Sequence, residues 1–127
     1  MTKGNKESIG KWIEKAEQDI IAAQTLFDIR PFILDVVCFH CQQAVEKLLK
    51  AFLFSKGQEI EKTHDIVFLQ EQCSNIDMDF SDIDFKNLNT YAVDARYPDF
   101  ISPELNEVKE YLLIAGKIKK LVLNKVS

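Results

Sequence analysis

One helical stretch of the sequence carries polar side chains at a spacing that could serve a binding site. The stretch reads CFHCQQAVEKLLKAFLF, and its polar line consists of His40, Gln43, Lys47 and Lys50. Intervals of three, four and three residues place all four side chains on one face of a helix. Ammonium, amide and imidazole groups can donate to phosphate oxygens, so the line could form one wall of an anion site. It could equally be a solvated helix edge, with Glu46 pairing with Lys50 one turn away.

A second candidate lies where a helix must end, at Arg96-Tyr97-Pro98. The Arg96 guanidinium can hold a phosphate through two parallel hydrogen bonds, and the Tyr97 ring can stack on a base. The same residues also suit a plain helix end. There Arg96 meets the negative end of the helix dipole or pairs with Asp94 or Asp99, and Tyr97 packs against the bundle.

His64 follows Thr63, a residue type that caps helices. At a helix N-terminus the neutral imidazole is favoured over the cation. His64 could therefore hydrogen-bond a ligand, or it could hold its connection against the preceding helix.

Cys38 and Cys41 flank His40 at a spacing that invites a metal site. Within one helix this spacing brings only two ligands to one point, so Cys73 and His64 would have to complete a tetrahedral site. Nothing in the sequence requires that arrangement. The sequence instead favours buried, reduced thiols, with no metal and no cofactor.

Helical periodicity predicts the elements that position these residues. Apolar spacing predicts long helices over residues 8–28 and 32–56, with a shorter helix capped by Thr63 after them. Pro31 separates the first two helices and Gly57 ends the second. The core stripe expected on the second helix is Val37, Cys41, Ala44, Leu48, Ala51 and Phe52.

Two more helices are predicted towards the C-terminus. Ser81 and Asp84 resemble a capping box that would open a fourth helix, which must end before Pro98. Ser102 as cap and Pro103 at the first turn predict a last helix. No segment alternates as a strand does. The predicted fold class is all-α, an up-and-down antiparallel bundle of four main helices plus one short helix.

The bulk composition restricts the class of protein. A chain of 127 residues suits one domain, residues 1–127, with one core. A net charge of −4 means that any phosphate contact must come from a local cluster of basic residues. The polar N-terminus lacks the apolar core of a signal peptide, and no apolar run is long enough to span a membrane. We therefore expect a cytoplasmic protein.

Three segments together resemble the HEPN domain, named for higher eukaryotes and prokaryotes nucleotide-binding. They are FHCQQAVEKLLKAFL on the second helix, THDIVFL opening the next, and YAVDARYPD closing the fourth. The resemblance covers roughly residues 8–125. It implies an all-α up-and-down bundle, often dimeric, of a kind commonly encoded beside a minimal nucleotidyltransferase in toxin–antitoxin pairs.

The resemblance also implies an activity, from which this sequence departs. Many HEPN domains are metal-independent ribonucleases with an arginine followed four to six residues later by a histidine. After Arg96 the chain reads YPDFISPEL, and its only histidines, His40 and His64, lie upstream. This absence argues against an enzyme, and we assign no catalytic residue.

The sequence thus predicts a cytoplasmic, homodimeric binding and regulatory module that pairs with a nucleotidyltransferase-type partner. It would bind a nucleotide or RNA phosphate through Lys47, Lys50 and Arg96, assisted by Tyr97 and His40. One alternative is a divergent ribonuclease in which His40 or His64 replaces the missing histidine. Another is a plain interaction domain that binds a protein through a surface formed by Phe39 and Leu53, with no small-molecule ligand.

Overall fold

A computed structural model describes residues 3–29, 33–92, 97–98 and 102–126 of the chain. The described residues form α-helices and short 3-10 helices, and none of them forms a strand. In chain order the elements are α1 (Lys3–Ile29), α2 (Leu34–Ser55), α3 (Ile66–Ile76), η1 (Met78–Phe80), η2 (Leu88–Ala92) and α4 (Leu105–Val126). This confirms the predicted all-α class. No helix in the described part of the chain is long and apolar enough to cross a bilayer.

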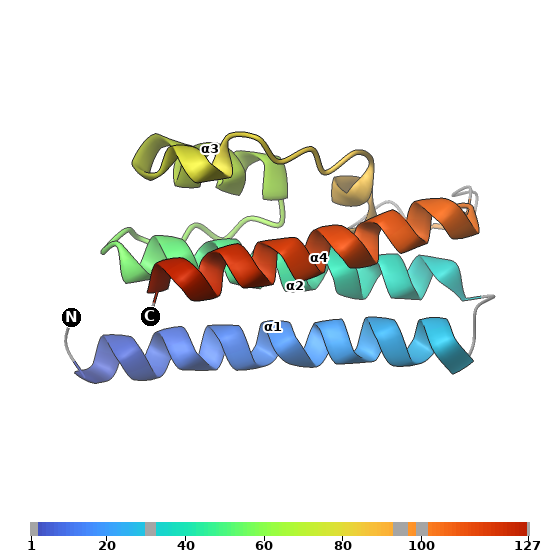
Figure 1. Cartoon of the computed structure of the whole chain (residues 1–127), viewed down its shortest axis with the longest axis horizontal. Coiled ribbons are helices and arrows are strands. Elements are labelled where there is room, and N and C mark those ends of the chain that lie inside the picture. Colours follow the sequence, from blue (N-terminus) through green and yellow to red (C-terminus); the bar gives the residue numbers. More distant parts are fainter. Residues whose placement is uncertain (1–2, 30–32, 93–96, 99–101, 127) are drawn as a thin grey trace.

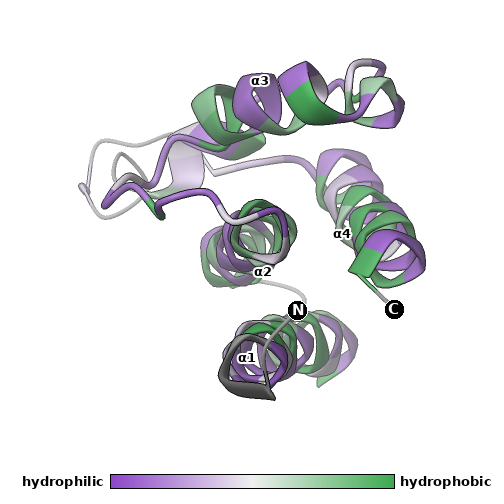
Figure 2. Cartoon of the chain, turned by 90° about the vertical axis from the view of Figure 1, so that its left-hand side faces the viewer, coloured by the Kyte–Doolittle hydropathy of each residue, from purple (hydrophilic) through white to green (hydrophobic). Residues whose placement is uncertain are grey.

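The long helices lie side by side with α2 in the middle (Figure 1). α1 packs along one side of α2, and α3 and α4 cover its other sides, as the end-on view shows (Figure 2). α2 runs antiparallel to α1, and the chain then returns along the bundle before α4, so α4 runs in the same direction as α2 (Figure 1). Successive legs therefore alternate in direction, as expected of an up-and-down fold.

The core follows from the apolar stripe of α2. Every residue of the predicted stripe is fully buried, and Val45 and Leu49 widen it. Phe52 stacks in a tilted arrangement on Phe80 of η1, with ring centroids 4.4 Å apart. Burial on several sides explains why this helix is so hydrophobic, since α1, α3, η2 and α4 all pack against it.

Helix α3 is capped by a different residue from the one expected. The Asp65 carboxylate accepts hydrogen bonds from the backbone N–H groups of Val67 and Phe68, at 3.0 and 3.2 Å. Thr63 Oγ1 instead accepts from the Asp65 backbone N–H, at 3.1 Å. The prediction of Thr63 as the cap was therefore wrong by two residues. Thr and Asp can both cap a helix, and α3 begins at Ile66, directly after Asp65.

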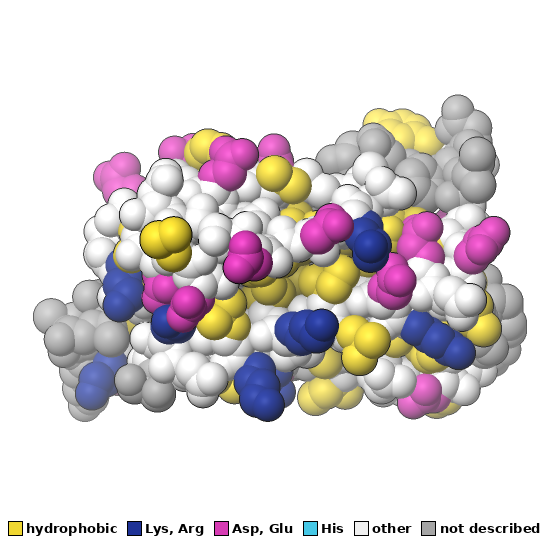
Figure 3. Space-filling model, turned by 45° about the horizontal axis from the view of Figure 1, so that its top comes forward, with side chains coloured by type: hydrophobic (Ala, Val, Ile, Leu, Met, Phe, Trp, Pro, Cys, Tyr) yellow, Lys and Arg dark blue, Asp and Glu magenta, His cyan; other side chains and the backbone are white. Residues whose placement is uncertain are grey.

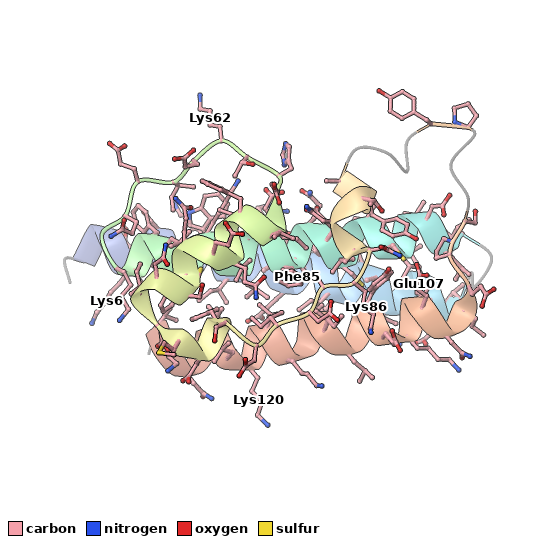
Figure 4. The ribbon with its side chains drawn as sticks, turned by 90° about the horizontal axis from the view of Figure 1, so that it is seen from above. Lys6, Lys62, Phe85, Lys86, Glu107 and Lys120 are labelled. Atoms are coloured by element: carbon pink, nitrogen blue, oxygen red, sulfur yellow. The ribbon has the colours of Figure 1, made fainter. Side chains whose placement is uncertain are left out.

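The predicted helix opened by Ser81 and Asp84 is wrong over residues 81–87, which form turns and irregular backbone. The Asp84 carboxylate accepts from the Lys86 backbone N–H at 2.8 Å, and Lys86 has a left-handed φ of 52°. Short polar side chains compete in this way with helical hydrogen bonds. The segment nevertheless contributes to the core through Phe85, which is buried and points into the bundle (Figure 4).

Helix α4 begins later than expected. Its first residue is Leu105, which is exposed, whereas Val108, Ala115 and Val122 are buried. Ser102 is not adjacent to the first turn, and its hydroxyl donates to Asp35 at 3.4 Å. Two tyrosine hydroxyls, one from Tyr91 of η2 and one from Tyr111 of α4, donate to one oxygen of Glu107 and join these elements.

Candidate functional site

The predicted polar line of α2 lies on one side of the helix but is not a free solvated edge. His40, Gln43 and Lys47 are half-buried, and Lys50 is only 6% exposed. The line faces α1 at some positions and the connection between α2 and α3 at others. Two carboxylates, Asp19 and Glu46, organise it into two clusters.

The first cluster joins α2 to α1 through Asp19, which is 9% exposed. Lys47 Nζ donates to Asp19 Oδ2 at 2.6 Å, and Asp19 Oδ1 lies 3.0 Å from His40 Nδ1. An ionised carboxylate only accepts hydrogen bonds, so His40 donates to Asp19 through Nδ1. This cluster therefore fixes where the Lys47 ammonium lies.

The second cluster joins α2 to the connection that precedes α3. Lys50 Nζ donates to Glu46 Oε2 at 3.1 Å, which confirms the expected pair one helical turn apart. Glu46 Oε1 lies 2.8 Å from His64 Nδ1 and accepts from Gln43 at 3.4 Å. The neighbouring Gln42 side chain donates to the His64 carbonyl at 2.7 Å. His64 thus ties the connection to α2, although most of its ring is exposed.

A hollow of about 280 Å³ opens beside Lys47, at the seam between α1 and α2. Its lining residues are Ser8, Lys11, Trp12, Lys15 and Lys47. Lys11 and Lys15 are exposed, and neither forms an ion pair with any described residue. Three lysine side chains therefore line one small space, largely through their apolar stems, and Lys47 alone among them is paired with a carboxylate of the described chain.

The residues that α1 contributes to this hollow were missed by sequence reasoning. Ser8, Lys11, Trp12 and Lys15 follow intervals of three, one and three, which places them on one helical face. Apolar periodicity draws attention to Trp12 as a core residue and away from the lysines beside it. The same spacing rule that identified the α2 line could have found this second line.

The other two predicted binding residues, Arg96 and Tyr97, come from the chain between η2 and α4. Arg96 falls outside the described residues. Tyr97 is 60% exposed, so the expectation that its ring packs against the bundle is wrong. The structure brings His40, Gln43, Lys47, Lys50 and His64 together along α2. Tyr97 lines neither of the clusters nor the hollow.

The surface expected from Phe39 and Leu53 does not form. Leu53 is 2% exposed and belongs to the core, because α2 is covered on more sides than a helix at the edge of a bundle. Phe39 is half-buried, and its ring meets His40 edge-on at 5.7 Å. These two residues cannot form an exposed apolar partner surface.

All three cysteine thiols are buried and free. Burial raises the pKa of Cys41 and of Cys73 to about 12, and it also raises the pKa of Cys38. The thiolate form, which is the metal ligand, is therefore disfavoured at neutral pH. Within the described ranges, no group of three or more His, Cys, Asp or Glu residues is arranged to hold a metal ion.

A second hollow, of about 390 Å³, lies between residues 82–86 and α4. Apolar side chains such as Ile114 and Ile118 line it together with charged residues of both signs. Figure 3 shows apolar side chains between acidic and basic ones on this face. Lys86 and Glu110 approach to 4.0 Å across it. Because its charges are mixed, this hollow is less suited to an anion than the hollow beside Lys47.

The fold and the site define an all-α bundle with a cationic hollow at a helix seam. The family model of the HEPN domain matches residues 9–126, so the chain belongs to the HEPN family. This confirms the resemblance drawn from the sequence.

Two crystal structures are similar to this chain over almost its whole length. TT1696 from Thermus thermophilus is 26% identical, with 92% of this chain and 97% of that chain covered and a TM-score of 0.68. ST0689, an archaeal HEPN homologue, shares the fold at 22% identity, with 94% and 98% covered and a TM-score of 0.67. The comparison with curated proteins gave no match.

Proposed function

We propose that this HEPN protein is a binding and regulatory module whose ligand carries phosphate groups, as a nucleotide or an RNA does. The observation that carries the proposal is the gathering of Lys11, Lys15 and Lys47 around one hollow. Lysine ammonium groups are compact charges on flexible stems, which suits phosphate oxygens that can be approached from several directions.

The charge balance of the hollow supports an anionic ligand. Lys11 and Lys15 are four residues apart on α1, and like charges at that spacing destabilise a helix by about 0.2–0.5 kcal/mol. Within the described chain, Asp19 is the only carboxylate paired with any of the three lysines, and His40 shares it. The chain as a whole is acidic, at −4, so this local excess of positive charge runs against its composition.

The remaining residues predicted from the sequence take supporting roles in this proposal. Lys47 would contact the phosphate, and His40 would help to position it through their shared partner Asp19. Lys50 is buried against Glu46, and Gln43 and His64 bind the same carboxylate, so these three would hold α2 and its neighbours in place. Tyr97 does not line the hollow and would contact only a longer ligand, and the phosphate-binding role predicted for Arg96 stays a prediction.

The ribonuclease alternative would assign a catalytic role to His40 or His64, whereas both imidazoles hold structural carboxylates in the described chain. Both imidazoles are bound through Nδ1 to different carboxylates, His40 to Asp19 of α1 and His64 to Glu46 of α2. A ribonuclease site would need one of them beside Arg96 and a scissile phosphate, and Arg96 falls outside the described residues.

Calorimetric titration with inorganic tripolyphosphate tests the phosphate site without involving a base. We expect saturable binding that weakens about tenfold or more in the double variant Lys11→Gln/Lys15→Gln, because two charge-assisted contacts are lost. Lys109→Gln/Lys120→Gln is the matched control, since both lysines are exposed on α4 and lie outside this hollow. Lys120 points away from the bundle (Figure 4). Equal losses in both double variants, or no binding at all, would contradict the proposal.

We further propose the nucleotidyltransferase-type partner and the homodimer that the family implies. Family membership supports both, while the burial of Leu53 removes the Phe39 and Leu53 surface that was expected to bind a partner protein. Light scattering on the chain alone, and on the chain mixed with a nucleotidyltransferase encoded beside it, tests them. A monomer that elutes apart from that partner would count against both.

A further inference from the structure

The hollow between residues 82–86 and α4 adjoins an apolar side chain that is largely uncovered. Leu113 is 64% exposed, and it lines the hollow together with Ile114 and Ile118. A single exposed leucine is ordinary on a protein surface, but Leu113 extends the apolar lining of a hollow of about 390 Å³ into one continuous apolar surface. We call this hollow and the exposed face of α4 around Leu113 the α4 groove.

The two sides of the α4 groove carry charges of opposite sign. Asp82 and Asp84 belong to the side formed by the segment before η2, and Lys117 belongs to α4, with Lys120 one turn further along. Within the described chain, none of these four side chains forms an ion pair. Figure 3 shows this face, with apolar side chains between acidic and basic ones. The groove therefore offers two anionic groups on one side and two cationic groups on the other.

One exposed ion pair crosses the groove. Lys86 Nζ lies 4.0 Å from Glu110 Oε2, and both side chains are about half exposed. Exposed pairs of this kind contribute little to stability, so a ligand that enters the groove can replace the contact with its own charges.

The acidic side of the groove is held in place although its backbone is irregular. The Gln70 side chain of α3 donates to the carbonyl oxygens of Phe80 and Ile83, each at 2.9 Å. Phe80 and Phe85 are buried on either side of Ile83 in sequence and anchor the segment in the core. A surface that is fixed before binding loses little freedom when a ligand arrives, which favours affinity.

We propose that the α4 groove binds an amphipathic helix of a partner protein, whose apolar stripe covers Leu113 and the hollow. Basic residues on one flank of that helix would face Asp82 and Asp84, and acidic residues on the other flank would face Lys117 and Lys120. An amphipathic helix presents such a stripe between two polar flanks, and recognition of a helix in an apolar groove is a recurring mode of binding. This inference does not depend on the phosphate site at the seam of α1 and α2.

Charge favours a partner protein over a second copy of this chain. Two α4 helices packed antiparallel with Leu113 on Leu113 would place Lys109 of each against Lys117 of the other, because residues equally far from the central contact face each other. Two parallel helices would place Lys117 against Lys117. Both arrangements oppose like charges, which disfavours the pairing.

Three designed peptides test the charge pattern. Each forms the same leucine-striped helix of about five turns. The first carries Glu on one flank and Lys on the other, the second carries Glu on both flanks, and the third carries Lys on both. We expect fluorescence anisotropy to show saturable binding of the mixed peptide, about fivefold or more tighter than that of the other two.

One substitution tests the apolar contact. Leu113→Gln should weaken binding of the mixed peptide about tenfold, because the side chain lies at the centre of the contact. Ile21→Gln is the matched control, since Ile21 of α1 is also 64% exposed and lies outside the groove, and it should bind the peptide as the unmodified chain does.

Reversing the charge on one side of the groove should change which peptide is preferred. In Lys117→Glu/Lys120→Glu both sides are acidic, so the peptide with Lys on both flanks should bind most tightly. Lys6→Glu/Lys62→Glu makes the same change of net charge at two exposed lysines elsewhere on the molecule (Figure 4), and it should keep the preference for the mixed peptide. Far-UV circular dichroism checks that both double variants fold.

The remaining outcomes would overturn the proposal. They are equal affinity for the three peptides, binding of none of them, and unchanged binding in folded Leu113→Gln. A change of preference in Lys6→Glu/Lys62→Glu as well would assign the effect to net charge. A dimer that Leu113→Gln converts into a monomer, measured by light scattering, would show that a second copy covers the groove in place of a partner helix.

Discussion

Asp19 decides how much of the positive charge at the α1–α2 seam is available to a ligand. It is almost buried, and it receives hydrogen bonds from both Lys47 and His40. The carboxylate therefore does two opposing things. It stabilises the packing of α1 on α2, and it offsets the charge of the one hollow lysine that α2 supplies.

This double role gives Asp19→Asn two effects of opposite sign. Lys47 and His40 lose their carboxylate, so the free energy of unfolding should fall by about 1–2 kcal/mol. The hollow loses one negative charge, so tripolyphosphate should bind roughly threefold to tenfold more tightly. Chemical denaturation and calorimetric titration measure the two effects separately.

Asp28→Asn is the matched control for this prediction. Asp28 lies on the same helix and is exposed, and its carboxylate accepts a hydrogen bond from Gln24 at 2.9 Å. The same change of charge at Asp28 should alter neither the free energy of unfolding nor the affinity for tripolyphosphate appreciably. Weaker anion binding in Asp19→Asn would instead mean that the carboxylate is needed to hold Lys47 in a productive position.

The sequence predicts an ion pair between two side chains of one helix more readily than an ion pair between two helices. Glu46 and Lys50 are four residues apart on α2, so their pairing followed from helical spacing. Asp19 meets Lys47 across 28 positions in sequence, and that contact depends on how α1 is rotated and shifted along α2. The periodicity of either helix alone does not define that register.

At the scale of elements, the long periodic helices were predictable and the segment before α4 was not. α1, α2 and α4 each bury an apolar stripe over many turns. The burial of such a stripe outweighs the conformational preferences of single residues along the helix. Residues 81–92 contain the apolar Phe85 and Leu88 at a helical interval, and both are buried. The nearby Asn89 side chain also accepts from the Ile66 backbone N–H and donates to Asp65, which fixes η2 at the start of α3.

Lys125 binds the end of α4 to two carboxylates, Asp77 at the end of α3 and Asp79 of η1. Its ammonium group lies 2.9 Å from Asp77 Oδ2 and 2.6 Å from Asp79 Oδ2. The hydrogen bond from Lys125 lowers the pKa of Asp77, and hydrogen bonds to Asp79 and Asp77 raise the pKa of Lys125. The ionised forms of both partners are therefore favoured in the folded protein.

These directions set the pH range in which the contact stabilises the fold. A carboxyl group whose pKa is lowered on folding contributes stability above its ordinary pKa of 3.8, and this is lost as the pH falls through the lower folded value. Lys125→Met should therefore lower the melting temperature most near neutral pH and hardly at all near about pH 2. Thermal unfolding over this range measures the difference, with Lys120→Met as the control. A pH-independent difference would assign the effect to packing of the side chain.

At the scale of the whole molecule, α2 is the element that the others share. α1 packs almost only on α2, while α3, η2 and α4 cover its remaining sides (Figure 2). The sequence of α2 already indicated burial on several sides, because its apolar residues extend beyond one helical stripe. What the sequence did not specify is that the cationic hollow belongs to the α1 side and the mixed-charge hollow to the α4 side.

A shared central helix predicts that the two sides unfold together. Phe52 is fully buried and its ring packs on Phe80, on a different side of α2 from Trp12. Phe52→Ala should lower the free energy of unfolding by about 3–5 kcal/mol through lost burial and a cavity. Denaturation followed by Trp12 fluorescence, which reports on α1, and by far-UV circular dichroism should show equal shifts of the unfolding midpoint.

Phe68→Ala, at a partly exposed position on α3, is the control and should lower the free energy of unfolding much less. If the Trp12 midpoint stayed in place while the dichroism midpoint fell, α1 and its hollow would form a unit whose stability does not depend on the rest of the core.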